Sequence, residues 1–417
     1  MAKTFSIISL GCPRNLVDSE SISAEFKARG YAFKDQARNI DTLIVNTCAF
    51  IEDAKRESVD VILKAIDAKK SGDIGKIIIA GCLTERYAKE LKKEFNEIDE
   101  FRGVLEFKDR GFDRNIFKLT PRHYAYIKIS EGCKNRCAYC VIPYLKGPYK
   151  SREIDTVIKE ARYLIERGVK EIILVGQDTS LYGIDLYGKK RLGLLLKRLD
   201  NISKANWVRL LYCHPANLDK DVIEIIRDRG SICKSIDLPI EHINDKILKK
   251  MGRRTKKKDI VSLMDYIRNE IPGAALRSSL IVGFPGETEQ DFQELLSFIR
   301  ESKFERLGLF KYSREEGTPA YKYKGQIPER EKERRFKEAM LLQQEISARV
   351  NERFKRQVLK VLIEEKKEDY YIGRTEYDAP EVDGLIYVKG KDLTIGCFYD
   401  VRVTDTYEYD LVGTTLT

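Results

Sequence analysis

The sequence predicts an α/β protein in three parts: an N-terminal doubly wound parallel sheet, a central partial (β/α)6 barrel and a small C-terminal β-barrel of the OB type. Three observations predict this fold. The first third repeats an apolar run followed by a polar helical stretch three times, and the middle repeats strand and helix six times more. Residues 346–417 instead alternate apolar and polar residues in short runs, as in GLIYVKG, which indicates antiparallel strands.

Three β-branched runs in the first third each end at a cysteine: FSIISLGC at Cys12, DTLIVNTC at Cys48 and KIIIAGC at Cys82. Such runs are typical of buried parallel strands, and helices are expected after them over 15–29, 52–70 and 84–95. The carboxyl ends of parallel strands share one edge of the sheet. One such cysteine would be interpreted as a small buried side chain, but three in equivalent positions are expected to meet at one site.

The middle of the chain, about residues 121–325, alternates strands with amphipathic segments. Six such units form an open or partial barrel, and the active site of such a barrel is expected at the carboxyl ends of its strands. Three further cysteines, Cys133, Cys137 and Cys140, directly follow the first of these strands. The six strands are expected at 124–129, 171–175, 207–212, 235–238, 276–282 and 306–312.

The C-terminal barrel is expected to be acidic. Residues 346–417 contain eleven Lys or Arg and fourteen Asp or Glu, a net charge of −3, whereas the rest of the chain carries +13. RNA binding relies on a basic surface, so an acidic barrel suits a basic protein partner better. A solvated acidic face without any partner is the other interpretation. A densely charged connecting helix is expected from Glu329 to Arg356.

Composition indicates the cellular compartment. The chain has 417 residues, a net charge of +10 and nine cysteines. No segment approaches the ~18 apolar residues of a membrane span, and the N-terminus lacks the pattern of a signal peptide. We therefore expect a cytoplasmic protein with reduced thiols. An odd number of cysteines there favours ligands or catalysts over disulfides.

The segment EGCKNRCAYC places Cys133, Cys137 and Cys140 within eight positions. A zinc site usually needs four protein ligands, and no second pair of cysteines or histidines lies nearby. A thioredoxin-like site needs only two thiols. A four-iron cluster held by three thiolates fits best, because it leaves one iron free to bind a substrate or cofactor.

The spacing Cys-x3-Cys-x2-Cys, with an aromatic residue before the last cysteine, resembles the radical S-adenosylmethionine (SAM) superfamily. This resemblance implies that the fourth iron holds SAM and that the reduced cluster cleaves it to a 5′-deoxyadenosyl radical. Two glycine-containing strand ends, LVGQDTS and LIVGFPGET, are expected to approach the cofactor closely. By this resemblance the SAM-binding residues are Tyr139, Gln177, Asp178, Arg277 and Gly283. Related enzymes usually have Gln at the position of Glu241.

Over nearly its whole length the chain resembles the radical SAM methylthiotransferases. The resemblance implies a methylthiotransferase domain over 1–120, a radical SAM domain over 121–345 and a TRAM domain over 346–417. It also implies two four-iron clusters, the second of which presents a methylated sulfur to a carbon radical. The expected ligands are Cys12, Cys48 and Cys82 for that cluster, and Cys133, Cys137 and Cys140 for the SAM cluster. The other three cysteines, Cys213, Cys233 and Cys397, are expected to be structural.

The segments SLGCPRNLVDSE and GRTEYDAPEVDG resemble the RimO branch of this family, which methylthiolates an aspartate of small-subunit ribosomal protein S-twelve. The MiaB branch, which modifies tRNA adenosine, usually has Gln-Met where this chain has Pro13-Arg14. A tRNA methylthiotransferase and a non-catalytic iron-sulfur protein are the alternatives. By charge complementarity we expect a basic ribosomal protein to dock on the acidic TRAM domain, and we further expect a low-potential electron donor and a monomer.

Two features of the surface are also predicted. Asp378, Glu381 and Asp383 lie in YDAPEVDG, where Pro380 and Gly384 favour an exposed turn, so these carboxylates are expected to steer the basic partner. The basic run at residues 253–258 is interpreted as solvated surface, with a contact to ribosomal RNA as the alternative.

Overall fold

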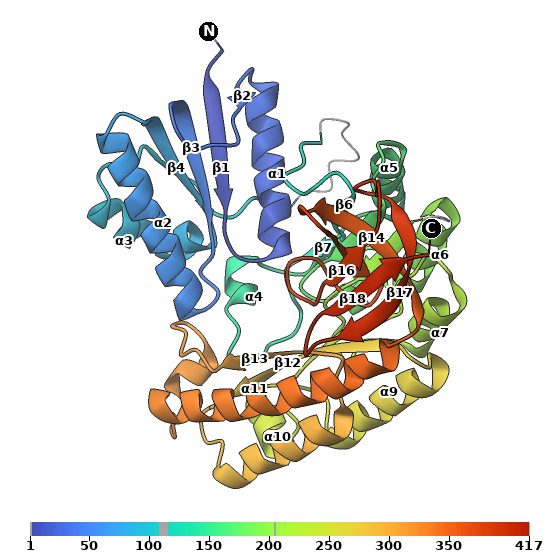
Figure 1. The fold of residues 1–417 in the computed structure, drawn as a ribbon. Helices are drawn as coiled ribbons and strands as arrows, with labels where there is room; N and C mark the ends of the chain where they lie inside the picture. Colours follow the sequence, from blue (N-terminus) through green and yellow to red (C-terminus); the bar gives the residue numbers. More distant parts are fainter. Residues whose placement is uncertain (1, 108–115, 204–205, 417) are drawn as a thin grey trace.

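The computed structural model describes residues 2–107, 116–203 and 206–416. The N-terminal sheet lies on one side of the molecule, the C-terminal barrel on the other and helix α11 below (Figure 1). Among these described residues, no helix combines the length and apolar character needed to cross a membrane.

The N-terminal part is a parallel sheet with the strand order β2-β1-β3-β4-β5. Helix α1 (Pro13–Ala28) packs Ile22 and Phe26 on one face of the sheet, whereas α2 (Glu52–Lys70) and α3 (Cys82–Glu94) cover the other. Helices on both faces confirm the predicted doubly wound sheet. The strands are β1 (Thr4–Ser9), β2 (Ala32–Phe33), β3 (Ile40–Thr47), β4 (Ile74–Gly81) and β5 (Glu100–Phe101).

The central part contains six parallel strands in two sheets, β6-β9-β10 and β11-β12-β13. The sheets meet edge to edge through the Val208–Ile232 bridge and the hydrogen bond from Cys213 N to Asp237 O, 2.9 Å. All six predicted strands are present, and their ends differ from the predicted ones by at most three residues. They are β6 (Tyr124–Lys128), β9 (Glu171–Val175), β10 (Trp207–Leu210), β11 (Ser235–Glu241), β12 (Ala275–Val282) and β13 (Arg306–Lys311).

Short and helical elements connect these strands, and their apolar faces form the largest core of the molecule. The helices are α4 (Ile142–Leu145), α5 (Ile154–Glu166), α6 (Leu192–Ser203), α7 (Lys220–Asp228), α8 (Asp245–Lys250), α9 (Lys257–Glu270) and α10 (Glu289–Ser302). The short elements are β7 (Ser130–Glu131), β8 (Lys150–Ser151), η1 (Thr179–Leu181) and η2 (Pro319–Lys322).

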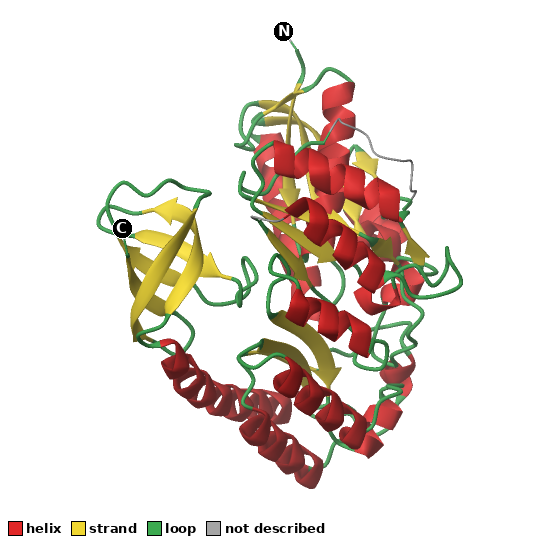
Figure 2. Ribbon diagram, turned by 90° about the vertical axis from the view of Figure 1, so that its right-hand side faces the viewer, coloured by secondary structure: helices red, strands yellow, loops and turns green. Residues whose placement is uncertain are grey.

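Helix α11 (Glu329–Asn351) and η3 (Glu352–Phe354) lead into a closed five-stranded barrel, which stands at the end of α11 in Figure 2. The predicted connecting helix therefore begins at Glu329 as expected but ends before Arg356. The barrel strands are β14 (Val358–Lys366), β15 (Tyr371–Thr375), β16 (Ile386–Lys389), β17 (Phe398–Thr406) and β18 (Leu411–Thr415).

The C-terminal barrel is joined to the amino ends of the central strands by buried ion pairs. Arg306 Nε lies 2.8 Å from Asp378 Oδ1, and Arg277 Nε lies 3.1 Å from Asp383 Oδ1. Glu171 accepts hydrogen bonds from Arg209 Nε and, across the interface, from Arg374 Nη2, both at 2.6 Å. The predicted exposed turn is therefore wrong for Asp378 and Asp383, because the central arginines pair with both carboxylates. Glu381 is exposed, as expected, and accepts a hydrogen bond from Tyr124.

The same contacts correct the predicted acidic surface of this barrel. Of its charged side chains, nine exposed carboxylates are matched by nine exposed cations within residues 346–416. The surplus of three negative charges lies entirely in side chains that are buried or half-buried, such as Asp378 and Glu364. Charge complementarity therefore acts inside the chain, between the barrel and the central arginines, and the exposed charges of the barrel sum to zero.

Candidate functional site

The first three predicted cysteines do meet at one edge of the N-terminal sheet. Cys12, Cys48 and Cys82 follow β1, β3 and β4, whose carboxyl ends lie side by side in parallel register. Gly11 has φ +88°, and a Cβ added to it would lie 2.8 Å from Cys48 Sγ. Glycine is therefore needed here for the segment carrying Cys12 to pass so close to the second thiol.

Electrostatics also group these thiols. Burial raises the pKa of Cys82 to about 12, and the negative charges of Cys48 and Cys12 add to the shift. Burial would also raise the pKa of Cys12, but the charge and hydrogen bond of Arg14 hold that pKa below its usual value. The three sulfurs thus act on one another, and one of them has a guanidinium beside it.

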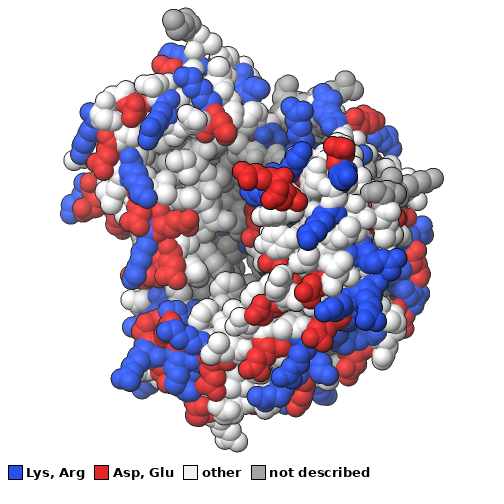
Figure 3. Space-filling view, in the orientation of Figure 1, with Lys and Arg blue, Asp and Glu red and all other residues white. Residues whose placement is uncertain are grey.

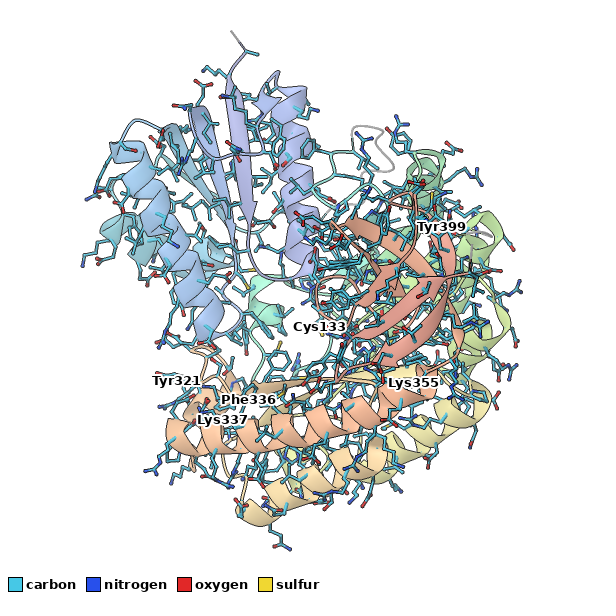
Figure 4. The ribbon with its side chains drawn as sticks, in the orientation of Figure 1. Cys133, Tyr321, Phe336, Lys337, Lys355 and Tyr399 are labelled. Carbon is cyan, nitrogen blue, oxygen red and sulfur yellow. The ribbon has the colours of Figure 1, made fainter. Side chains whose placement is uncertain are left out.

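The second triplet lies in the loop after β7, at the carboxyl end of the central strands. The loop is anchored by hydrogen bonds from Ala138 N to Met251 O and from Ala320 N to Ala138 O, both 2.8 Å. Cys133 Sγ accepts a hydrogen bond from Asn135 N at 3.4 Å. Burial and the charges of Cys137 and Cys133 raise the pKa of Cys140 to about 12. Figure 4 places Cys133 between α4, α11 and the C-terminal barrel.

Neither triplet is arranged around one metal ion. Within residues 2–107, 116–203 and 206–416, no three His, Cys, Asp or Glu side chains have the geometry of a mononuclear site. In a four-iron cluster each thiolate binds a different iron, so the ligands of a cluster need not converge on one point.

Two of the predicted SAM-binding residues lie beside the central triplet. Asp178 Oδ2 accepts hydrogen bonds from Asn135 Nδ2 at 2.8 Å and from Asn217 Nδ2 at 2.7 Å. Gln177 donates to Glu131, but its Oε1 is buried and has no hydrogen-bond partner among the described residues. An unsatisfied buried acceptor at this position indicates that a ligand completes the site.

Tyr139 and Gly283 are also near this loop. The Tyr139 ring packs edge-on against Phe284, and burial together with the charges of Cys137 and Glu241 raises the Tyr139 pKa. Gly283 has φ +74°, and a Cβ there would lie 2.4 Å from Lys332 Cγ of α11. Packing against α11 explains why glycine occurs at this position, so the predicted contact of Gly283 with SAM stays a prediction.

Arg277 and Arg253 both have surroundings that the sequence did not predict. Arg277 binds Asp237 and Asp383, so two carboxylates already satisfy its guanidinium and its contact with SAM stays a prediction. Arg253, interpreted as solvated surface, is buried, and its Nη1 lies 3.8 Å from Cys137 Sγ while its Nε has no partner among the described residues. That interpretation is wrong for Arg253. The only local signal was Gly252, where a Cβ would lie 2.8 Å from the carbonyl oxygen of Arg136 in the cysteine loop.

Buried ion pairs hold the two triplets in one site. Asp18 of α1 pairs with Lys128 of β6 and with Lys146, whose Nζ lies 2.9 Å from Asp18 Oδ2. Glu131 also pairs with Lys128, at 2.6 Å. The space-filling view shows a hollow between the N-terminal sheet and the C-terminal barrel, and few charged side chains line its visible walls (Figure 3).

A second group of ion pairs lies on the other side of the N-terminal sheet. Glu315, which follows β13, pairs with Arg86 Nη1 at 2.6 Å and with Lys55 Nζ at 3.1 Å. The N-terminal sheet therefore contacts the segments that follow both the first and the last strand of the partial barrel. It closes the barrel at the carboxyl ends of the strands, where both triplets lie.

Family models match all three parts of the chain. The radical SAM superfamily matches residues 127–299, the TRAM domain matches residues 357–416, and uncharacterized protein family UPF0004 matches residues 4–103. Among solved structures, the radical S-adenosylmethionine methyltransferase TsrM from Kitasatospora setae is similar, with a TM-score of 0.54 and 14% identity over 77% of each chain. At this identity the similarity shows a shared fold.

Curated relatives match nearly end to end. The ribosomal protein uS12 methylthiotransferase RimO of Clostridioides difficile is 43% identical, and the match covers 98% of each chain. The same enzyme of Parabacteroides distasonis is 42% identical over 98% of each chain, and that of Acetivibrio thermocellus is 43% identical over 99% of this chain and 98% of the relative. This chain therefore belongs to the RimO family of radical SAM methylthiotransferases.

Proposed function

We propose that this protein attaches a methylthio group to the β-carbon of an aspartate in ribosomal protein uS12, using SAM and two four-iron clusters. The observation that carries the proposal is the pair of cysteine triplets, each with three free thiols at the carboxyl ends of parallel strands, in two parts of the chain that the ion pairs of Asp18 join. The names of the full-length relatives supply the substrate protein. In the net reaction a C–H bond of the substrate is replaced by a C–S bond.

The residues around the central triplet fit a cluster that carries SAM. Three thiols leave one iron without a protein ligand, and two buried groups beside them, Gln177 Oε1 and Arg253 Nε, lack partners among the described residues. SAM carries an amino group that can donate to the amide oxygen and a carboxylate that can accept from the guanidinium. When bound, the cluster and SAM would supply the radical that removes hydrogen from an unactivated carbon.

The chain's own residues would hold and shield this chemistry. Asn135 connects the loop to the strand end through Cys133 and Asp178, so it fixes the thiol and the carboxylate together. The ion pairs of Asp18 and Glu315 hold the second triplet opposite the first. A fixed distance matters because the substrate carbon must be reached from both sides.

Mass spectrometry of ribosomal proteins and tRNA from a strain that lacks this chain tests the proposal. We expect uS12 to lose the mass of one methylthio group at an aspartate, and tRNA to be unchanged. Restoring the gene should restore the modification, whereas a gene with Cys133, Cys137 and Cys140 changed to Ala should not. Loss of a methylthio group from tRNA instead would establish the tRNA alternative.

A further inference from the structure

The cations near the two triplets differ in whether a carboxylate accompanies them. Lys128 and Lys146 pair with Asp18 and Glu131. Arg253 and Arg14 form no ion pair with any carboxylate among the described residues. Arg253 lies beside the central triplet, where it has been proposed to meet SAM. Arg14 lies beside the other triplet and has no assigned role.

Arg14 bridges the two halves of the site. From the first turn of α1 its Nη1 donates to the carbonyl oxygen of Gly176, at the end of β9, over 3.1 Å. It lies two residues after Cys12, and its guanidinium carbon lies 4.6 Å from the centre of the Tyr212 ring. The side chain remains partly exposed. A guanidinium has five N–H donors, and the hydrogen bond to Gly176 uses only one of them.

The surroundings hold Arg14 in place. Tyr212 has φ +62°, an uncommon conformation for a non-glycine residue, and its backbone is fixed on both sides. Its N–H donates to Asp237 Oδ2 at 2.9 Å, and its carbonyl oxygen accepts from Thr179 N at 3.0 Å. The strained backbone presents the ring beneath the guanidinium, which restricts the rotamers of Arg14 before any ligand binds.

The position of Arg14 in α1 is also unfavourable for the helix alone. Cations near a helix N-terminus oppose the helix dipole, and the first turn of α1 contains no acidic residue that would offset this. A residue that breaks a local rule in this way is expected to have a role in the site.

We propose that Arg14 binds the side-chain carboxylate of the substrate aspartate and so makes the enzyme selective for an acidic residue. This inference rests on the proposed function and adds its specificity determinant. The reacting β-carbon is bonded directly to the carboxylate carbon, so a carbon placed between the two triplets brings its carboxylate into the same space. Arg14 follows Cys12 in the chain on one side of that space and reaches Gly176 on the other.

The chemistry predicts discrimination between aspartate and asparagine. A carboxylate offers two acceptor oxygens to the guanidinium fork and brings a negative charge to an unpaired cation. The amide of asparagine offers one oxygen, and its NH2 group would face a side chain that can only donate. Asparagine has the same shape and the same β-carbon, so it isolates the contribution of the charge.

Two synthetic peptides of the uS12 loop, one with the target Asp and one with Asn, serve as substrates for the reconstituted full-length enzyme. We expect wild type to favour the Asp peptide in kcat/KM for methylthiolation, and Arg14→Met to reduce this preference about tenfold to a hundredfold, the usual range for losing a hydrogen bond to a charged group. Arg14→Lys keeps the charge without the fork and should retain most of the preference. Arg29→Met, an exposed position at the other end of α1, is the matched control and should behave as wild type.

The ratio of kcat/KM for the Asp peptide to kcat/KM for the Asn peptide is measured within one preparation. Partial loss of folding or of iron therefore does not change this ratio. Iron content and SAM cleavage are measured alongside, so that a loss of either is separated from a loss of the preference. If Arg14→Met slows both peptides equally, or if Arg14→Lys loses the preference completely, Arg14 serves Cys12 rather than the substrate and the inference is overturned. Absence of methylthiolation of the Asp peptide by wild type would instead contradict the proposed function.

Discussion

The two ends of the central barrel use the same kinds of charged residue for different purposes. At the amino ends of the strands, Arg306, Arg277 and Arg374 each have a carboxylate partner, and they join the C-terminal barrel to the central one. At the carboxyl ends, Arg14 and Arg253 have none among the described residues and lie beside thiols. Both ends are well packed, but among the described residues the arginines of the amino end have carboxylate partners, whereas Arg14 and Arg253 at the carboxyl end do not.

This difference separates structural from functional burial. A buried ion pair with complete hydrogen bonding needs nothing further, and removing one partner leaves a buried charge alone. A buried cation without a carboxylate is costly unless a ligand supplies the negative charge. The comparison predicts that changes at the carboxyl end remove activity and spare folding, whereas changes at the amino end do the reverse.

The largest effect is expected from the central triplet. Changing Cys133, Cys137 and Cys140 together to Ala should abolish SAM cleavage and halve the iron, from about eight to about four atoms per chain if both clusters are of the four-iron type. Iron analysis and assay of 5′-deoxyadenosine after anaerobic reconstitution measure both quantities. Continued SAM cleavage by this variant would contradict the assignment of the triplet.

Removing the N-terminal triplet, which lies at the same end of the barrel, should abolish a different activity. Replacing Cys12, Cys48 and Cys82 with Ala should stop methylthiolation and leave reductive SAM cleavage intact, since the central triplet keeps its own ligands. The two products are measured in the same reaction by mass spectrometry. Methylthiolated product from this variant would show that these cysteines are only structural.

At the amino end, Asp378→Ala should destabilise the protein without affecting chemistry. The change leaves Arg306 buried without its partner, and breaking a buried pair costs about 3–5 kcal/mol. The single tryptophan, Trp207, packs 4.7 Å from the ring of Phe398 in β17, so its fluorescence reports on this interface during urea unfolding. SAM cleavage per folded molecule should stay at the wild-type level.

Asp405→Ala provides the matched control for this change, because Asp405 pairs with Lys355 on the exposed surface of the same barrel. It should leave the urea midpoint nearly unchanged. If Asp378→Ala lost SAM cleavage while keeping its stability, the proposed division between the two ends would fail.

The smallest expected effect is in the acid sensitivity of the two ends. Burial lowers the pKa of His242, just past β11, from 6.5 to about 4, so protonation favours unfolding and stability falls as the pH drops from 6.5 to 4. Burial raises the pKa of Glu364, but His123 and Arg374 more than offset this and lower it from 4.5 to about 2. Its contribution is therefore lost only below pH 4.5. His242→Gln should make the urea midpoint depend less on pH between pH 6.5 and 5. If the midpoint fell with pH as steeply as in the wild type, this assignment would be contradicted.

Local patterns in the sequence were sufficient for the strands and the cysteines. The β-branched runs that end at Cys12, Cys48 and Cys82 predicted their meeting at one edge, because parallel strands align their carboxyl ends whatever surrounds them. The six central strands were predicted for the same reason. Gln177 and Asp178 were predicted beside the central triplet from the end of one strand and from the family resemblance.

Local patterns could not predict which charged side chains are buried or with which partners they pair. A basic run gives no indication of which member turns inward, so Arg253 was interpreted as surface, and an acidic loop gives no indication of its partner, so Asp378 and Asp383 were expected in solvent. The pairs Arg277–Asp383 and Arg306–Asp378 join residues 106 and 72 positions apart.

The sequence by itself therefore determined the three-part fold and the two cysteine triplets, because these depend on periodicity and spacing within short segments. Only the tertiary structure decided which charges are paired and which are left for a ligand. The physical reason is that an ion pair depends on the distance between two side chains, and packing of the three parts sets that distance. Arg14 and Arg277 have the same side chain, but Arg277 has two carboxylate partners and Arg14 has none among the described residues.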